Sequence, residues 1–335
     1  MRLPTRDDVA RTAKVSGATV SRVLNGRHDE YVSSDTRERV LHAVRELGYH
    51  PNHMGRALVT GRTGLVALWM DHLLTPFYSY VAHFFTNQAS SHGYETTISL
   101  RNRRHPVTLG TNSPRVSSWP VDGIIAHEDD RRVRAYLCLP KSRRTPIVSV
   151  GGVDFKIPEV DYVGIDLKSG AIEAVRHLIR TGGRRVAMMI DGDFGHEGDE
   201  RWKAYHEVML DAGMEPELIL TENQTRLAGR SAIVSYVQQK GCPDSIFCYN
   251  DVLAISAFRG LRDLGIRIPD DVALIGCDGI EDAEYHDPAI SSVVQPISAM
   301  CSLAWDCLER RLREPSCDLH QTVLKPELVL RESTR

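Results

Sequence analysis

The chain has 335 residues, of which 42% are hydrophobic and 25% are charged, and its formal net charge at pH 7 is −3. This composition predicts a soluble globular protein of two or three domains. The sequence contains neither a long apolar run nor an N-terminal secretory signal, so we expect no membrane span and no export. The seven cysteines are scattered without a C-x-x-C pair or a His/Cys cluster, which predicts reduced thiols in a cytoplasmic protein with no metal and no cofactor.

Positive charge is concentrated at the start of the chain. Residues 1–62 contain eleven Lys and Arg against seven Asp and Glu, whereas the rest contain 30 against 37. A basic N-terminal segment (residues 1–62, the head) followed by an acidic remainder (the body) indicates that the head binds a polyanion. The same excess is also typical of an ordinary solvated surface.

Three helices are expected within this head. Thr5 precedes an acidic first turn, and apolar residues then recur at helical spacing as far as Ala13. Ser16 can cap a second helix. A third helix begins around Ser34 and stops at Gly48. Its expected inward residues are Val40, Leu41, Val44 and Leu47.

The second helix has one packed face and one free face. At about 100° per residue, Val20, Val23 and Leu24 fall on one arc, and the opposite arc holds Gly17, Ala18, Ser21, Arg22 and Asn25. Two short helices around a tight turn, covered by a third, form a helix-turn-helix whose second helix enters the major groove of DNA. We therefore expect Arg22 to read guanine and Ala18 to touch a thymine methyl, with Ser21 and Asn25 on phosphates. The alternative is a surface helix that faces only water.

The strings DDVARTAKVSGATVSRVLNG, VSSDTRERVLHAVRELGYHPN and GRAL, over residues 7–58, resemble the DNA-binding headpiece and hinge of the lactose-repressor (LacI/GalR) family of bacterial transcription regulators. The resemblance implies a helix-turn-helix domain over residues 1–50. It also implies a hinge over residues 51–62 that becomes helical on operator DNA and inserts Leu58 into the minor groove; a plain linker is the alternative. The implied DNA-binding residues are Thr5, Ser16, Gly17, Ala18, Thr19, Ser21, Arg22, Asn25, Arg56 and Leu58.

The head departs from the family pattern at three places. Gly55 stands where alanine is usual, which predicts a hinge that is harder to fold because glycine disfavours a helix. Lys14 stands where the turn usually has glycine, which predicts modest strain if its φ is positive. The loop over residues 27–31 is slightly long, so no phosphate contacts are assigned to it.

From Gly64 onward, short apolar runs alternate with helical patterns, which predicts parallel sheets flanked by helices. The resemblance continues through residues 75–78, 122–125, 164–166, 201–205, 250–251, 269–278 and 295–296. It implies an α/β, two-lobed, periplasmic-binding-protein-like domain for effector binding and dimerisation over residues 63–335. The first lobe is expected at about residues 63–165 and 292–320, and the second at about 166–291 and 321–335. A Pro/Ser/Asn-rich stretch over residues 103–120 replaces an expected helix.

The resemblance also implies an effector pocket at the carboxyl ends of the strands, where open sheets of this class bind ligands. Acidic, amide, guanidinium and aromatic side chains there suit a mono- or oligosaccharide. The implied residues are Asp71, Phe77, Tyr78, Asp166, Arg201, Trp202, Asn250 and Asp278. Asp71, Asp166 and Asn250 could equally cap or turn the backbone, and Trp202 could be core. Gly151 and Gly152 stand where a loop aspartate is usual, and residues 127–130 (HEDD) are expected to form a solvated loop.

Other classes of protein are less well supported by the sequence. It contains no G-x-G-x-x-G after a strand, no G-x-x-x-x-G-K-[ST] and no G-x-S-x-G, which argues against an α/β enzyme. An exported solute-binding protein would need a signal sequence and no DNA-binding head. The resemblance implies a homodimeric regulator of a pseudopalindromic operator, associated with the nucleoid. It also implies that a sugar induces release of DNA, which is the commoner behaviour in the family; co-repression is the alternative. The C-terminus lacks the heptads of a tetramerisation helix.

Overall fold

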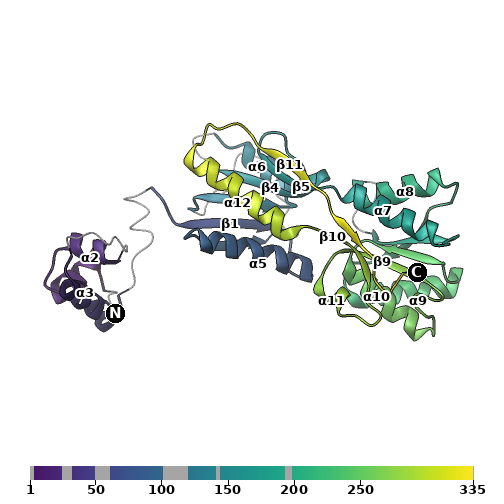
Figure 1. The fold of residues 1–335 in the computed structure, drawn as a ribbon. Helices are drawn as coiled ribbons and strands as arrows, with labels where there is room; N and C mark the ends of the chain where they lie inside the picture. The colour runs from purple at the N-terminus through teal and green to yellow at the C-terminus, as the bar shows by residue number, and fades with distance from the viewer. Residues whose placement is uncertain are drawn as a thin grey trace. The chain divides into compact units, whose positions relative to one another are not determined.

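The computed structural model describes residues 4–24, 32–49, 61–100, 120–140, 144–192 and 198–334 (Figure 1). The chain divides into two compact units, a headpiece over Met1–Thr63 and a body over Gly64–Arg335. Among the described helices, none has the length and apolar character needed to cross a membrane.

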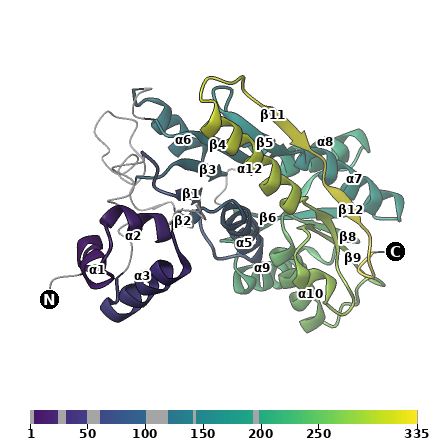
Figure 2. The same cartoon turned by 60° about the vertical axis from the view of Figure 1, so that its left-hand side comes forward.

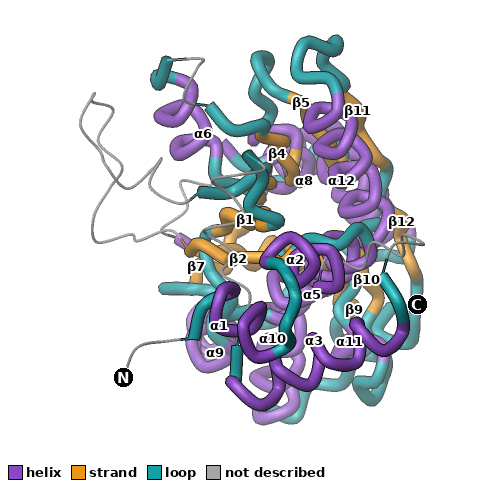
Figure 3. The backbone as a smooth tube through the Cα atoms, turned by 90° about the vertical axis from the view of Figure 1, so that its left-hand side faces the viewer, coloured by secondary structure: helices purple, strands orange, loops and turns teal. Residues whose placement is uncertain are grey.

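The described part of the headpiece consists of helices and loops, as Figure 3 shows. Its helices are α1 (Arg6–Thr12), α2 (Gly17–Leu24) and α3 (Ser34–Leu47). All three contribute to one small core, which contains Val9, Ala13, Val20, Val40 and Ala43. The helix-turn-helix predicted from apolar periodicity is therefore confirmed.

The helix ends are formed by the residues that the sequence indicated. Thr5 and Asp8 form a capping box at α1, in which the Asp8 amide donates to Thr5 Oγ1 at 3.3 Å and the Thr5 amide donates to Asp8 Oδ2 at 2.9 Å. Ser16 Oγ accepts from the Thr19 amide at 3.1 Å at the start of α2. Gly48, at φ +59°, ends α3 in the left-handed conformation.

The expected inward position of Leu41 is wrong. Leu41 is 38% exposed, whereas Ala43 is 1% exposed and packs in the core. The core-facing arc of α3 is centred near Val40, and Leu41 lies about 100° away from it. A small alanine on the correct arc is buried in preference to a large leucine at its edge.

The turn between α1 and α2 holds Lys14 at φ +53°. A side chain with a Cβ is strained in this conformation, and glycine is not. The left-handed conformation costs a residue with a Cβ about 1–2 kcal/mol, whereas the flexibility of glycine in the unfolded chain costs about 0.5–1 kcal/mol. Lys14→Gly is therefore expected to stabilise the headpiece by about 0.5–1 kcal/mol, the difference between the two. Hydrogen exchange of α1 and α2 amides in the full-length protein measures this. Unchanged or faster exchange in the variant would argue against strain at Lys14.

The body contains two six-stranded sheets, one in each lobe. The first runs in the order β11-β5-β4-β3-β1-β2 and is parallel throughout. Its strands are β1 (Leu65–Met70), β2 (Glu95–Leu100), β3 (Gly123–His127), β4 (Ile147–Gly152), β5 (Asp161–Ile165) and β11 (Gln321–Leu324). Its helices are α5 (Pro76–Ser91), α6 (Asp130–Leu137) and α12 (Ile297–Arg313), of which α5 and α12 pack on each other, as Figure 2 shows.

The second sheet runs in the order β12-β10-β9-β8-β6-β7 and is parallel except for the β10–β12 pair. Its strands are β6 (Val186–Asp191), β7 (Glu217–Thr221), β8 (Ser245–Cys248), β9 (Ala273–Asp278), β10 (Ser291–Val294) and β12 (Glu327–Val329). Its helices are α7 (Leu167–Arg180), α8 (Glu200–Asp211), α9 (Arg226–Lys240), α10 (Asp251–Asp263) and the short α11 (Glu281–Glu284). The α9–α10 and α7–α8 pairs are each closely packed.

Three connections join the lobes, and two of them lie later than expected. The first is at Asp166, between β5 and α7. The others follow β10 and β11, because β10 belongs to the second sheet and β11 to the first. The expected lobe limits at 292 and 321 are thus three to four residues too early. A short apolar run predicts a strand but does not indicate which sheet it joins.

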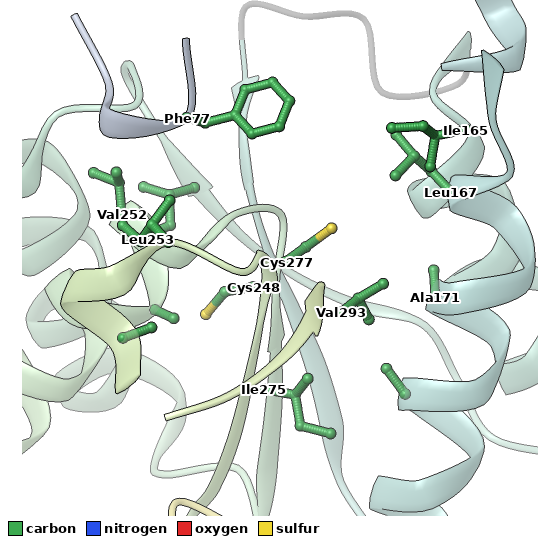
Figure 4. Packing of buried hydrophobic residues seen from close by; sticks show 14 of the residues in the cluster. Phe77, Ile165, Leu167, Ala171, Cys248, Val252, Leu253, Ile275, Cys277 and Val293 are labelled. Carbon is green, nitrogen blue, oxygen red and sulfur yellow. The ribbon is translucent and has the colours of Figure 1, made fainter. Parts of the chain in front are cut away.

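The hydrophobic core continues from one lobe into the other. Phe77, from the start of α5, belongs to the same buried cluster as the second-lobe residues Cys277 and Val293 (Figure 4). Ile165 and Leu167, on either side of the first connection, lie across from it in the same view. The polar groups described below stand on elements that contribute to this shared core.

Candidate functional site

The recognition face of α2 carries small and polar side chains. Ala18 and Arg22 are exposed, and Thr19 and Ser21 are half-buried. On the opposite face Val20 and Val23 are buried. The hydroxyls of Thr5 and Ser16 serve as caps, which fixes their positions at the ends of α1 and α2. The predictions for Asn25, Arg56, Leu58, Gly55 and the loop 27–31 lie outside the described residues.

In the body, side chains from both lobes meet where strands end. Asp71 follows β1, Glu128 follows β3, Tyr249 follows β8 and Asp278 ends β9. Tyr78 Oη donates to Glu128 Oε2 at 2.7 Å. Burial raises the pKa of Tyr78 well above its usual value, and the nearby Glu128, Tyr249 and Asp71 raise it further. Because Tyr249 and Asp278 belong to the second lobe and Asp71, Tyr78 and Glu128 to the first, this is one site between the lobes.

Arg201 is the central cation of this site. Its side chain is buried, and it bonds Asp199 with both Nε (3.2 Å) and Nη2 (2.9 Å). The guanidinium also lies over the Tyr249 ring, 3.6 Å from the centroid. Burial opposes the charge of Arg201, but Asp199 keeps the pKa of Arg201 well above its usual value. Arg201 therefore stays charged, and Asp199 neutralises much of that charge.

Asp278 supplies a buried carboxylate close to Arg201. It has φ +120°, and its Oδ1 accepts from Gln295 Nε2 at 2.9 Å. Burial raises the pKa of Asp278, and the neighbouring Asp251 raises it further. The backbone of Asp278 is strained, and Asp251 holds the following loop, because its Oδ2 accepts from the Gly279 and Ile280 amides at 2.7 and 2.9 Å.

The expected solvated loop over residues 127–130 is wrong, because His127 and Asp129 are buried. Neither ring nitrogen of His127 has a hydrogen-bond partner among the described residues, and burial lowers the pKa of His127. Glu128 takes φ +51° and turns its side chain toward Gly151, where a Cβ would lie 2.6 Å from Glu128 Cγ. Glu128 thus brings a carboxylate beside Gly151, which stands at the position where the family pattern has a loop aspartate.

Three predicted pocket residues have other contacts. Asp166 caps α7 by accepting from the Ser169 amide at 3.0 Å, and Asn250 caps α10 by accepting from the Leu253 amide at 2.9 Å. The Trp202 ring stacks on His206, with centroids 4.7 Å apart. Their roles in effector binding remain predictions.

Two residues of the site, Tyr249 and Asp199, are not indicated by the sequence pattern, and Glu128 is expected from that pattern to lie in solvent. Tyr249 directly precedes the expected Asn250, and Asp199 lies two residues before Arg201. The position of Tyr249 and Glu128 at strand ends was the available indication, since ligands bind at that edge of the sheet.

Both the headpiece and the body match known protein families. Residues 5–52 match the lacI family of bacterial regulatory proteins, and residues 175–334 match the periplasmic binding protein-like domain. The HTH-type transcriptional regulator CelR of Thermobifida fusca is 33% identical, over 99% of this chain and 98% of CelR. A structure of a CelR–cellobiose complex is 31% identical with a TM-score of 0.68, covering 98% of this chain and 99% of that one. The lac repressor dimer bound to operator and an anti-inducer is 21% identical with a TM-score of 0.82, covering 99% of each chain.

A helix-turn-helix headpiece joined to a two-lobed body with a polar site between the lobes defines a DNA-binding transcriptional regulator. Its curated relatives are regulators, so the enzyme and solute-binding alternatives do not hold. The chain belongs to the lacI family of bacterial regulatory proteins.

Proposed function

We propose that this regulator is a homodimer that represses transcription from a pseudopalindromic operator and releases it when a neutral sugar binds between the lobes. The observation that carries this proposal is the convergence of Tyr78 and Glu128 from one lobe with Arg201, Tyr249 and Asp278 from the other. A ligand that bridges these groups changes how the lobes meet. The coupling is reciprocal, so operator lowers sugar affinity by the factor by which sugar lowers operator affinity.

The charges of the site favour a neutral ligand. Asp199 binds the guanidinium of Arg201, and Asp71, Glu128 and Asp278 add further acidic groups. Among these described groups four are acidic and one is a cation, so a phosphate or carboxylate would meet little free positive charge. Hydroxyls can pair with carboxylates and with the buried His127 ring, and a sugar ring can stack on tyrosine. The cellobiose bound by CelR is such a neutral sugar.

A binding screen tests this function. We expect cellobiose, lactose, ribose or another neutral sugar to raise the melting temperature of the full-length protein, since ligand at a hundred times its Kd adds about 2.7 kcal/mol. The same sugar should weaken binding to an operator selected from random duplexes. Glucose 6-phosphate serves as the charged control. Tighter binding of the phosphorylated sugar, or a sugar that binds without any effect on operator affinity, would contradict the proposal.

DNA reading is tested at Arg22. The exposed Arg22 guanidinium can bind guanine O6 and N7 with two hydrogen bonds. Arg22→Ala should cost about 1–3 kcal/mol of operator affinity and relax the preference at one base pair per half-site. The measurement is a titration against the selected operator and its single-base variants. Equal losses on operator and random DNA would exclude base reading by Arg22.

We expect the second copy to bind the surface formed by α9, α10 and α11. Leu227 and Tyr285 are 71% and 79% exposed there. Beside them is a hollow of about 590 Å³ whose lining includes Ile255 and Phe258. Large exposed apolar side chains around a hollow are typical of a protein interface. In such a dimer two headpieces related by a twofold axis would bind a pseudopalindromic operator. Because operator DNA lies in the nucleoid, the protein would act there, in the cytoplasm.

A further inference from the structure

The start of α2 has no long side chain of its own with which to read a base. Gly17 has no side chain, and Ala18 ends at a methyl group. The Thr19 hydroxyl is bonded to Ser16 Oγ at 2.9 Å. Apart from the Thr19 hydroxyl, the first turn of the helix that enters the groove therefore offers DNA no hydrogen-bonding side chain, and Arg22 is the one arginine of α2.

The side chain of Arg6 occupies the space that Gly17 leaves open. A Cβ on Gly17 would lie 3.0 Å from Arg6 Nε and 3.3 Å from Arg6 Cζ. Arg6 is the first residue of α1, so a side chain from one helix covers the start of the next. Alanine at position 17 would require this guanidinium to shift slightly, and a side chain much larger than alanine would compete with it for the same space.

Stability of the headpiece does not explain this position. A cation at the N-terminal ends of two helices is disfavoured by both helix dipoles. The one described ion pair of Arg6 is with Asp7, at 3.4 Å between side chains that are 54% and 76% exposed. Such a pair is weak, and it leaves most of the five guanidinium donors available for a ligand.

We propose that Arg6 is a second base-reading residue, which Gly17 admits to the recognition face so that its guanidinium reads a guanine at the end of the half-site next to the start of α2. The proposal rests on the assignment of α2 as the DNA-reading helix. It predicts that the operator half-site contains two arginine-read guanines, one for Arg22 and one for Arg6.

The experiment uses the full-length protein and an operator that it selects from a pool of random duplexes. Affinities for this operator and for each single-base variant are measured at one salt concentration for wild type, Arg6→Ala, Arg22→Ala and Arg39→Ala. Arg39 is the matched control, because it is also an exposed arginine paired to an aspartate of its own helix, Asp35, at 3.2 Å. Arg6→Ala should weaken operator binding about tenfold or more and abolish the preference at one base pair that Arg22→Ala leaves intact.

A substitution that moves the Arg6 guanidinium away from Gly17 should also abolish the preference at that base pair. Gly17→Leu is expected to relax the same base pair, and the double variant Arg6→Ala/Gly17→Leu should lose little beyond Gly17→Leu alone. Equal loss on all DNA, with a smaller salt dependence, would show that Arg6 contacts only phosphate and would overturn the proposal, as would a loss no larger than that of Arg39→Ala. If Arg22→Ala relaxes no base pair either, α2 does not read DNA and the assignment beneath the proposal fails as well.

Discussion

Arg201→Ala is expected to abolish the response to effector while leaving operator affinity unchanged. Arg201 is 7% exposed and joins Asp199 to the Tyr249 ring at the centre of the site between the lobes. Its loss removes a cation from among several acidic groups, so sugar affinity should fall by about a hundredfold, the effect of roughly 3 kcal/mol. Calorimetric titration with the sugar from the binding screen, and operator binding with and without it, measure the two effects.

The variant must stay folded for this comparison to be informative. Leaving Asp199 without its partner destabilises the second lobe, so melting of each variant is recorded. Arg201→Lys keeps a positive charge near Asp199 but loses the planar guanidinium that can form two parallel hydrogen bonds. This variant should bind sugar more weakly than wild type and should have a melting temperature close to that of wild type. Arg185→Ala is the control, since Arg185 pairs with Glu217 at 2.7 Å at the start of a strand in the same sheet. A sugar response retained by folded Arg201→Ala would move the effector site elsewhere.

Features that depend on nearby residues could be predicted from the sequence. The three headpiece helices follow from caps and apolar spacing within a few residues, and Thr5, Ser16 and Gly48 have the roles predicted for them. The alternation of strands and helices likewise depends on short apolar runs. Leu41 was misplaced because hydrophobicity alone does not distinguish the centre of a helix face from its edge.

Features that depend on distant residues could not be predicted in this way. Glu128 enters the site because its backbone is left-handed and because Gly151, on the next strand, leaves room for its side chain. Neither the left-handed backbone of Glu128 nor the space left by Gly151 can be inferred from the residues next to Glu128 in the sequence. The sheet that β11 joins is also decided by its pairing with β5, in which Gln321 lies opposite Tyr162, far away in the sequence.

Asp251→Ala is expected to lower the free energy of unfolding by about 3–5 kcal/mol. Asp251 is fully buried and accepts from the Gly279 amide at 2.7 Å, the Ile280 amide at 2.9 Å and Ser292 Oγ at 2.7 Å. Alanine would leave two buried amides and a hydroxyl without an acceptor. Urea unfolding measures the loss. A loss below about 1 kcal/mol would contradict the central role of Asp251 in holding the loop after β9.

Asp251→Asn should recover most of this stability and should also change how stability depends on pH. Burial raises the pKa of Asp251 from 3.8 to about 7 despite its hydrogen bonds, so the folded protein binds a proton that the unfolded chain releases. The stability contributed by this proton is complete below pH 3.8 and is lost as pH rises through about 7. Asparagine cannot lose a proton, so the advantage of wild type over Asp251→Asn should shrink, or reverse, between pH 5 and pH 8.

Asp263, at the other end of α10, provides the control for this pH dependence. Its hydrogen bond with Arg230 lowers the pKa of Asp263, so this carboxylate is ionised in both the folded and the unfolded chain above pH 5. The difference between wild type and Asp263→Asn should therefore stay constant over the range in which the Asp251→Asn difference changes. If both differences are constant, Asp251 is ionised in the folded protein, and its hydrogen bonds outweigh its burial.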